Sequence, residues 1–320
     1  MRRGVTRSAW FVAALLVVLV GSSVGAAASA ANSIPLGDYS GADNPAGVAG
    51  FGSTTGTHMS LASDFLNGSS TWAVLDGASG VDAWRSSGYR LVLAVPILPK
   101  HARSSLSKGA RGAYNSYFVT LAHNLVNAGE GNAYLRIGWE FNGTWYKWSV
   151  HNARGAVEYA LYFQNIVNAM RSVPGQSFKF VWNPNGGASH GRSYNASLAY
   201  PGNAFVDYIG TDLYDESWVQ PLTPANAWAG QLSATWGLNW LASFAAAHGK
   251  PVVFPEWGVA IRNDGHGLGD DPYFVNQFAS WISSHNVAWD NIFTVDDAQQ
   301  DDMTDGSFPN ALAAFQADFG

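Results

Sequence analysis

The feature that most constrains this chain is a regular alternation of short apolar runs with segments of helical period. Eight runs of four or five residues have the length and composition of buried strands: residues 34–38, 58–61, 91–95, 133–137, 178–182, 208–212, 251–254 and 292–295. Strands that alternate with helices pair in parallel, so eight such units predict a single-domain (β/α)₈ barrel. An open, doubly wound sheet is the alternative.

The segments between these runs carry apolar stripes of helical period. The clearest stripes are Tyr114, Phe118, Leu121 and Leu125, followed by Ala160, Phe163, Val167 and Met170. Residues 239–247 also have a helical pattern, and Gly249 suits a C-terminal cap. Residues 42–61 are rich in Gly, Ser and Thr, so we expect mostly loop there.

The first thirty residues have the pattern of an export signal. Three arginines precede an apolar run at residues 10–20, and Ala28-Ser29-Ala30 is a suitable cleavage site. The run is too short for a typical membrane span, although a retained N-terminal anchor is the alternative. We therefore expect a secreted chain that has no contact with the membrane after cleavage, with residues 31–320 forming the barrel.

Composition narrows the class of partner. Without the three arginines of the signal, the net charge falls from −6 to −9, and no basic cluster remains. Nucleic acid and anionic membranes are therefore poor candidates as partners. The chain has 14 Trp but only 12% charged residues, which suits a surface that meets neutral sugars. We expect a monomer. The chain has no Cys and so no disulfides, but it is long enough to bury a core without them.

Two of the five glutamates differ from the others because each closely follows an apolar run among aromatic residues. They are Glu140, between Trp139 and Phe141, and Glu256, between Pro255 and Trp257. In a (β/α)₈ barrel, the residues that follow the strands form the active site. Both glutamates are therefore candidates for it.

Strand alternation indicates where the two side chains point. Period two places Arg136 on the same side as Glu140, and Phe254 on the same side as Glu256. If both sides face the barrel axis, the two carboxyl groups meet at one mouth. A carboxylate among aromatic rings needs a partner or a function. The structural alternative is a buried ion pair with Arg136, and the functional one is glycosidic cleavage, which needs one carboxylic acid and one carboxylate.

Three segments carry a resemblance to a known family. Residues 139–148, Trp-Glu-Phe-Asn-Gly-Thr-Trp-Tyr-Lys-Trp, resemble the acid/base motif of glycoside hydrolase family 26, a family of (β/α)₈ retaining glycosidases whose catalytic glutamates follow strands four and seven. Residues 255–258 resemble its nucleophile segment, and residues 207–214 resemble its strand-six segment, whose Tyr contacts the nucleophile. The likeness runs loosely from strand one to strand seven. It implies a retaining endo-β-glycanase related to the β-mannanases, with a polysaccharide as its partner.

The sequence departs from the mannanase pattern at three places. Trp139 stands where those mannanases have a His before the acid/base. Residues 95–99 lack the sugar-contacting His expected there, and residues 292–297 lack the expected Trp. The substrate is therefore left open between β-mannan, β-glucan, β-xylan and a polymer of the producer's own cell envelope. A non-catalytic sugar-binding protein on the same scaffold is the rival from another class.

The resemblance and the chemistry together assign roles. Glu140 is the predicted acid/base and Glu256 the predicted nucleophile, with Asp212 as the next choice of nucleophile. Arg136 and Tyr214 are expected to keep Glu256 ionised. The full set of residues expected to bind substrate is Arg136, Trp139, Asn142, Trp145, Trp148, Asn183, Asp212, Tyr214, Trp218 and Trp257. Among these, Trp145, Trp148 and Trp218 are expected as stacking platforms, unless they pack the loops.

Metal and cofactor chemistry are not expected. The eight His are scattered without paired ligand spacing, and no phosphate-binding or dinucleotide-binding fingerprint is present. The pairs at residues 296–297 and 301–302 are two neighbouring Asp each, yet they lack a recognised calcium-binding pattern. We expect a solvated loop there and no cofactor.

Overall fold

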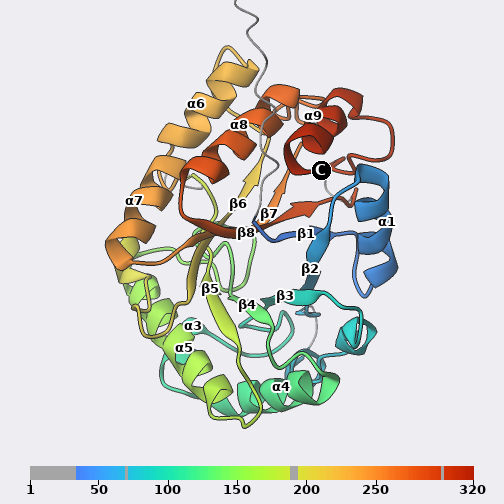
Figure 1. Cartoon of the computed structure of the whole chain (residues 1–320). Coiled ribbons are helices and arrows are strands. Elements are labelled where there is room, and N and C mark those ends of the chain that lie inside the picture. The colour runs from blue at the N-terminus through green and yellow to red at the C-terminus, as the bar shows by residue number, and fades with distance from the viewer. Residues whose placement is uncertain (1–33, 69–70, 188–193, 297–298) are drawn as a thin grey trace, which may run out of the picture. The chain divides into compact units, whose positions relative to one another are not determined.

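Eight parallel strands close into a barrel in the computed structural model of the chain, which describes residues 34–68, 71–187, 194–296 and 299–320 (Figure 1). The strands are β1 Leu36–Tyr39, β2 Met59–Phe65, β3 Arg90–Val95, β4 Tyr134–Ile137, β5 Lys179–Trp182, β6 Tyr208–Tyr214, β7 Val252–Gly258 and β8 Val287–Phe293. Each strand pairs with the next in sequence, and β8 pairs with β1. The predicted (β/α)₈ barrel is confirmed, and the open sheet is wrong. The predicted signal at residues 1–30 lies outside the described residues.

Helices surround the strands (Figure 1). They are α1 Pro45–Thr55, α2 Trp72–Asp76, α3 Leu106–Ala110, α4 Asn115–Ala128, α5 Ala153–Arg171, α6 Pro224–Ser233, α7 Leu238–His248, α8 Pro272–Ser284 and α9 Pro309–Phe319, with 3₁₀ turns η1 Val81–Trp84 and η3 Ala196–Leu198. In the described part of the β5–β6 connection, the short turn η3 stands where a helix would be expected. The loops on this flank of the barrel border the site described below.

The predicted helical stripes are confirmed. Phe118, Leu121 and Leu125 are buried on α4, and the stripe of α5 is buried likewise. Gly249 caps α7 with a φ of 62°, a left-handed conformation that glycine adopts without steric cost. Helix α1 corrects the loop expected over residues 42–61. Its start is set by Asn44, whose side chain accepts a hydrogen bond from the backbone N–H of Gly47 at 3.0 Å.

Strand β8 begins five residues before the predicted run at 292–295. Two polar residues, Asp290 and Asn291, interrupt its apolar pattern, so the first part of the strand does not form an apolar run. Trp289 nevertheless lies inside the barrel, with its ring stacked on Tyr134 at 5.1 Å between centroids. Asp290 accepts a hydrogen bond from the indole N–H of Trp257 at 2.8 Å, which satisfies one of its buried oxygens.

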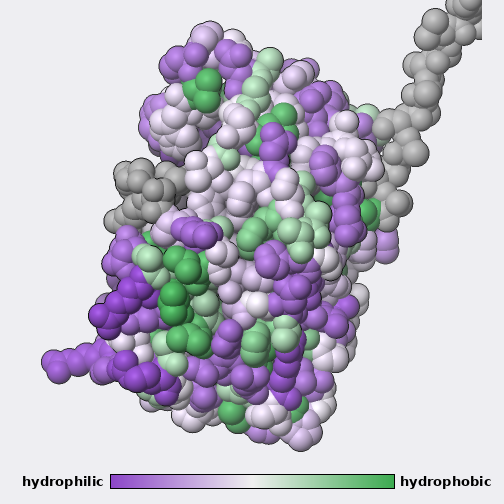
Figure 2. Space-filling model, turned by 90° about the vertical axis from the view of Figure 1, so that its left-hand side faces the viewer, coloured by the Kyte–Doolittle hydropathy of each residue, from purple (hydrophilic) through white to green (hydrophobic). Residues whose placement is uncertain are grey.

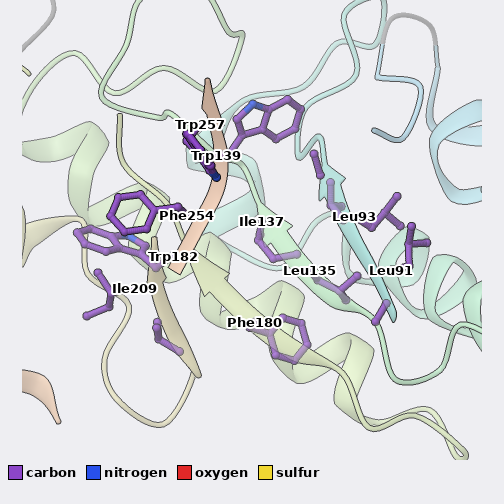
Figure 3. Close-up of a cluster of buried hydrophobic side chains, with 14 of the residues drawn as sticks. Leu91, Leu93, Leu135, Ile137, Trp139, Phe180, Trp182, Ile209, Phe254 and Trp257 are labelled. Atoms are coloured by element: carbon purple, nitrogen blue, oxygen red, sulfur yellow. The ribbon is translucent and has the colours of Figure 1, made fainter. Parts of the chain in front are cut away.

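Alternate residues of the strands divide between two cores. Leu91 and Leu93 of β3 belong to the large outer core beneath the helices, together with Leu135, Ile137 and Phe180 (Figure 3). The residues that alternate with them form a smaller core inside the barrel: Leu61, Val92, Tyr134, Val181, Val253 and Trp289. By the same alternation, Arg136 of β4 points into the barrel, one layer above Tyr134.

A β-bulge in β7 decides where Glu256 points. Gly210 of β6 pairs with Val253 of β7. Asp212 lies two residues after Gly210, but its partner, Glu256, lies three residues after Val253. The extra residue in β7 reverses the alternation of sides. Phe254 consequently packs outward against Phe278 of α8, whose ring centroid lies 4.8 Å away. The prediction that Phe254 shares a side with Glu256 is therefore wrong, although Glu256 does point into the barrel.

The surface shows small apolar patches. On the face in Figure 2, hydrophobic side chains lie in separate groups among hydrophilic ones. Three of the most exposed aliphatic residues, Val157 and Leu161 of α5 and Leu198 of η3, are 37–44% exposed. None of the helices in the described part of the chain combines the length and hydrophobicity needed to cross a bilayer.

Candidate active site

A buried arginine lies at the centre of the site. Arg136 is fully buried, and its Nη1 and Nη2 atoms lie 2.6 Å from Glu256 Oε1 and 2.7 Å from Asp212 Oδ2. Its Nε donates to the side-chain oxygen of Asn183 at 3.3 Å. Burial lowers the pKa of the Arg136 guanidinium, but the charges of Asp212 and Glu256 outweigh burial and raise it. The guanidinium therefore stays charged, and the ion pair considered from the sequence is present for Glu256.

Both oxygens of the Glu256 carboxylate have partners. Oε1 accepts from Arg136, and Oε2 accepts from the hydroxyl of Tyr214 at 2.8 Å. The bond from the guanidinium is charge-assisted, and such hydrogen bonds are among the stronger ones in proteins. The predicted contact between Tyr214 and Glu256 is present. Glu256 is only 8% exposed, so these partners hold its carboxyl group at a fixed position with little water around it.

Glu140 has a different environment. Its two carboxyl oxygens accept from the indole N–H of Trp145 at 2.8 Å and from the side-chain amide of Asn185 at 2.9 Å, and no direct ion pair involves it in the described part of the chain. Burial, followed by the negative charge of Glu256, raises the pKa of Glu140 to about 8. At neutral pH its carboxyl group therefore holds a proton. Two carboxyl groups at one mouth thus have different surroundings: Glu256 has a cationic partner and Glu140 has none among the described residues.

The backbone at Glu140 is strained. Strand β4 ends at Ile137, and Gly138 and Glu140 have φ angles of 55° and 49°. A residue with a Cβ rarely adopts this left-handed conformation, and such strain clusters at functional sites. The Glu140 backbone N–H donates to the carbonyl of Asn183 at 2.7 Å, which anchors the turn to the end of β5.

Asp212 lies deeper than the two glutamates. Its Oδ2 accepts from Arg136 and from the amide of Asn183 at 3.1 Å, and its side chain is only 1% exposed. Burial raises its pKa well above the usual range. A group this enclosed is poorly placed to attack a sugar, so the arrangement favours Glu256 over Asp212 as nucleophile.

Two of the tryptophans predicted to bind substrate are buried in packing positions. Trp148 is 4% exposed, stacks on Tyr146 at 4.5 Å, and donates its indole N–H to the carbonyl of Trp139. Trp257 is fully buried and packs outward against Phe278 at 4.4 Å, since the residue after Glu256 points to the opposite side of β7. Trp148 as a stacking platform and Trp257 as a sugar contact are therefore wrong.

The other predicted residues lie around the mouth. Trp145 and Trp218 are 51% and 60% exposed, as a stacking platform requires. Trp139 is almost fully buried, with its ring 5.7 Å from the guanidinium carbon of Arg136 and its indole N–H donated to Tyr146. Asn183 is fully buried beside Arg136, so it positions charged groups rather than facing solvent.

Asn142 holds the loop of Asn185, a residue that the sequence pattern does not predict for the site. Its side-chain oxygen accepts from the backbone N–H of Asn185 at 2.7 Å, and its amide donates to the carbonyl of Asn185 at 2.8 Å. Asn185 in turn pairs with Asp212 at the end of β6 and binds Glu140. The only indication of Asn185 in the sequence is that it is a second amide side chain, two residues after Asn183.

The loop considered for calcium has a structural explanation. Asp296 Oδ1 accepts from the backbone N–H groups of Asp301 and Asp302 at 2.8 and 3.0 Å. Asp297 lies outside the described residues. Within the described ranges, no three His, Asp or Glu side chains are arranged to hold a metal ion.

Comparison with known proteins finds a similarity over the part of the chain that carries these residues. A family model described as glycosyl hydrolase family 26 matches residues 113–262, which include Arg136, Glu140, Tyr214 and Glu256. Over these residues the chain is similar to glycoside hydrolase family 26. It is 28% identical over 140 residues to a mannan endo-1,4-beta-mannosidase of Bifidobacterium adolescentis, covering 42% of this chain and 13% of that protein. It is 25% identical over 222 residues to endoglucanase H of Acetivibrio thermocellus, covering 65% and 22%. The chain thus spans less than a quarter of the length of each of these two relatives.

Solved structures show the same fold. GH26C from a Muricauda species aligns with a TM-score of 0.63 and 17% identity, covering 89% of this chain and 84% of that chain. A modular endo-beta-1,4-mannanase of Cellulomonas fimi aligns with a TM-score of 0.60 and 19% identity, covering 89% and 70%. At this identity the likeness concerns the barrel. The comparisons together show a sequence similarity to family 26 and a shared barrel fold.

Proposed function

We propose that this chain is a retaining endo-β-glycanase that hydrolyses a β-linked polysaccharide of the mannan or glucan type. The observation that carries the proposal is the contrast between two carboxyl groups at one barrel mouth. Glu256 is held by the charged Arg136 and by Tyr214, whereas Glu140 has no direct cationic partner in the described residues and keeps a proton. Glycosidic cleavage with retention requires this pairing of a nucleophile with an acid.

In the first step, a carboxylate oxygen of Glu256 attacks the anomeric carbon. The bond from that carbon to the glycosidic oxygen breaks, and Glu140 gives its proton to the departing oxygen. The product is a glycosyl ester of Glu256 and a shortened chain. Arg136 and Tyr214 limit the nucleophile to one position, so little reorganisation is needed during attack.

In the second step, the role of Glu140 reverses because its surroundings change. The charge of Glu256 is one cause of the raised pKa of Glu140, and esterification removes that charge. The pKa of Glu140 then falls, and its carboxylate can take a proton from water. That water attacks the anomeric carbon, breaks the ester and restores both groups, with net retention of configuration.

The comparisons support a mannan-type or glucan-type substrate. One relative is named as a mannan endo-1,4-beta-mannosidase and the other as an endoglucanase. Trp139, in place of the family's His, packs against Tyr146 and makes this mouth different from the mannanase pattern. For that reason a cell-envelope glycan belongs in the substrate panel. We further propose that residues 1–30 direct export and that the mature chain acts as a monomer.

The test combines a substrate panel with variants of both glutamates. We expect the wild type to release reducing ends from mannan or β-glucan, and Glu140→Gln and Glu256→Gln to lose nearly all of that activity. Glu256→Ala with azide should form a glycosyl azide of inverted configuration. Glu158→Gln is the matched control, because Glu158 forms an ion pair with Arg154 at the surface of α5. Unchanged activity in either catalytic variant removes that residue from the mechanism. Polysaccharide binding without hydrolysis would favour the non-catalytic rival.

A further inference from the structure

A cavity of 220 Å³ lies beside the two glutamates, over the ends of β5 and β6. Two residues of its wall are also partners of the catalytic groups, since Asn185 donates to Glu140 and Tyr214 donates to Glu256. The cavity therefore shares part of its wall with the cleavage centre. Asn185 is fixed there by its pairing with Asp212, so this wall is rigid.

The outer wall of the cavity carries Trp218, an exposed ring in a fixed orientation. The ring is 60% exposed, yet it stacks on His266 with centroids 4.8 Å apart and an angle of 26° between the planes. His266 Nδ1 lies 3.0 Å from the carbonyl of Ser217, which requires the nitrogen to donate. The ring therefore has one supported face and one face open to a ligand, with little conformational entropy left to lose on binding.

The residues behind Trp218 are themselves fixed. The guanidinium carbon of Arg262 lies 5.7 Å from the Trp218 ring, and Arg262 forms ion pairs with Glu216 and Asp264, each at 2.6 Å. Gln231 donates its amide to the backbone carbonyls of Tyr214 and Glu216, at 3.0 and 2.9 Å. These bonds join the loop of Trp218 to the end of β6. The position of the ring relative to the cleavage centre is thereby set before any ligand arrives.

The chemistry of the wall selects an uncharged ligand. The ionisable acids that line the cavity are Asp212 and Glu216, and no Lys, Arg or His is among the described lining residues. Both acids are already paired, Asp212 with Arg136 and Glu216 with Arg262, so the wall offers no free cation to an anionic sugar. The wall also offers apolar surface from Val219 and Ala234 beside the indole. A flat apolar platform with a few polar groups suits a neutral pyranose.

We propose that this cavity and Trp218 form a separate subsite for a neutral pyranose unit of a linear polysaccharide, on the β5–β6 flank of the cleavage centre. The inference rests on the proposed function and deepens it, since it places a second point of recognition away from the scissile bond. Chains long enough to reach Trp218 gain binding there. Chains too short to reach it are cleaved without that gain.

The first experiment measures kcat/KM for Trp218→Ala on linear manno- and gluco-oligosaccharides from the biose to the hexaose. We expect a loss of roughly tenfold for the longer members and none for the shortest cleaved member, as truncation of an anchoring aromatic implies. Trp218→Phe should keep most of the rate. Leu161→Ala is the control, because Leu161 is 44% exposed on α5 and serves neither glutamate. An equal loss at every length, or no loss at any length, overturns the proposal.

The second experiment separates this proposal from the proposed function. Calorimetric binding of the same hexaoses is compared in the wild type, Glu256→Gln and the double variant Glu256→Gln/Trp218→Ala. We expect about tenfold weaker binding when Trp218 is absent. If no oligosaccharide is cleaved but Trp218→Ala still weakens binding, the catalytic proposal fails and the subsite stands. If cleavage occurs and binding does not depend on Trp218, the subsite fails alone.

Discussion

Replacing Trp145 by Phe should move the alkaline limb of the pH–rate profile to higher pH. The Trp145 indole donates to Glu140 at 2.8 Å and stabilises the ionised carboxylate, which opposes the effects of burial and of the Glu256 charge. Phe keeps an aromatic face for stacking but has no N–H. Burial and the Glu256 charge then still raise the pKa of Glu140, opposed by the charge of Arg136 and by the remaining hydrogen bond from Asn185.

The size of this change follows from the contact. A hydrogen bond to a charged group contributes about 1.5–3 kcal/mol, and 1.36 kcal/mol corresponds to one pKa unit, so a dry site would give about 1–2 units. Trp145 is 51% exposed, so water can replace part of the lost bond. We therefore expect an increase of about half to one unit from the wild-type value of about 8.

The sign follows from the role of Glu140. The acid form gives the proton to the leaving oxygen, so activity is present below its pKa and lost as the pH rises through it. The assay is kcat/KM between about pH 5 and pH 10 for wild type and Trp145→Phe. Glu140→Gln, assayed on an aryl glycoside whose leaving group needs no proton, should show no alkaline limb. A limb that stays in place or moves to lower pH in Trp145→Phe would refute the reasoning.

Two further predictions concern stability. Arg136→Met leaves Asp212 and Glu256 buried without their cation and should lower the free energy of unfolding by about 3–5 kcal/mol, measured in urea; a wild-type value would contradict the ion pairs. Burial raises the pKa of Asp290 from 3.8 to about 7, and the hydrogen bond from Trp257 lowers it by a smaller amount. The folded state therefore holds this proton more tightly than the unfolded state. As the pH rises from about 4 to about 7, the wild type should lose at most about 4 kcal/mol of its free energy of unfolding through this group. Asp290→Asn can still accept from Trp257 and should lack this loss, so equal slopes of Tm against pH in the two proteins would count against the assignment.

Local pattern was sufficient for most of the fold. The apolar stripes of α4 and α5 and the cap at Gly249 are properties of neighbouring residues, so they are visible in the sequence. Strand β8 was misplaced because Asp290 and Asn291 are polar and yet lie within a buried strand. Helix α1 was missed because its glycines outweighed the start signal of Asn44 and Pro45.

The sequence by itself determined the barrel and drew attention to Glu140 and Glu256, because period and composition act over a few neighbouring residues. Tertiary structure alone decided that a bulge turns Glu256 inward, because one extra residue matters only against the pairing of the adjacent strands. It also decided which tryptophans are available to a ligand. Trp257 and Trp145 each lie close in sequence to one of the two glutamates, yet Trp257 is fully buried and Trp145 is half exposed. Exposure depends on what packs from distant parts of the chain, and protonation depends on charges brought together by that packing.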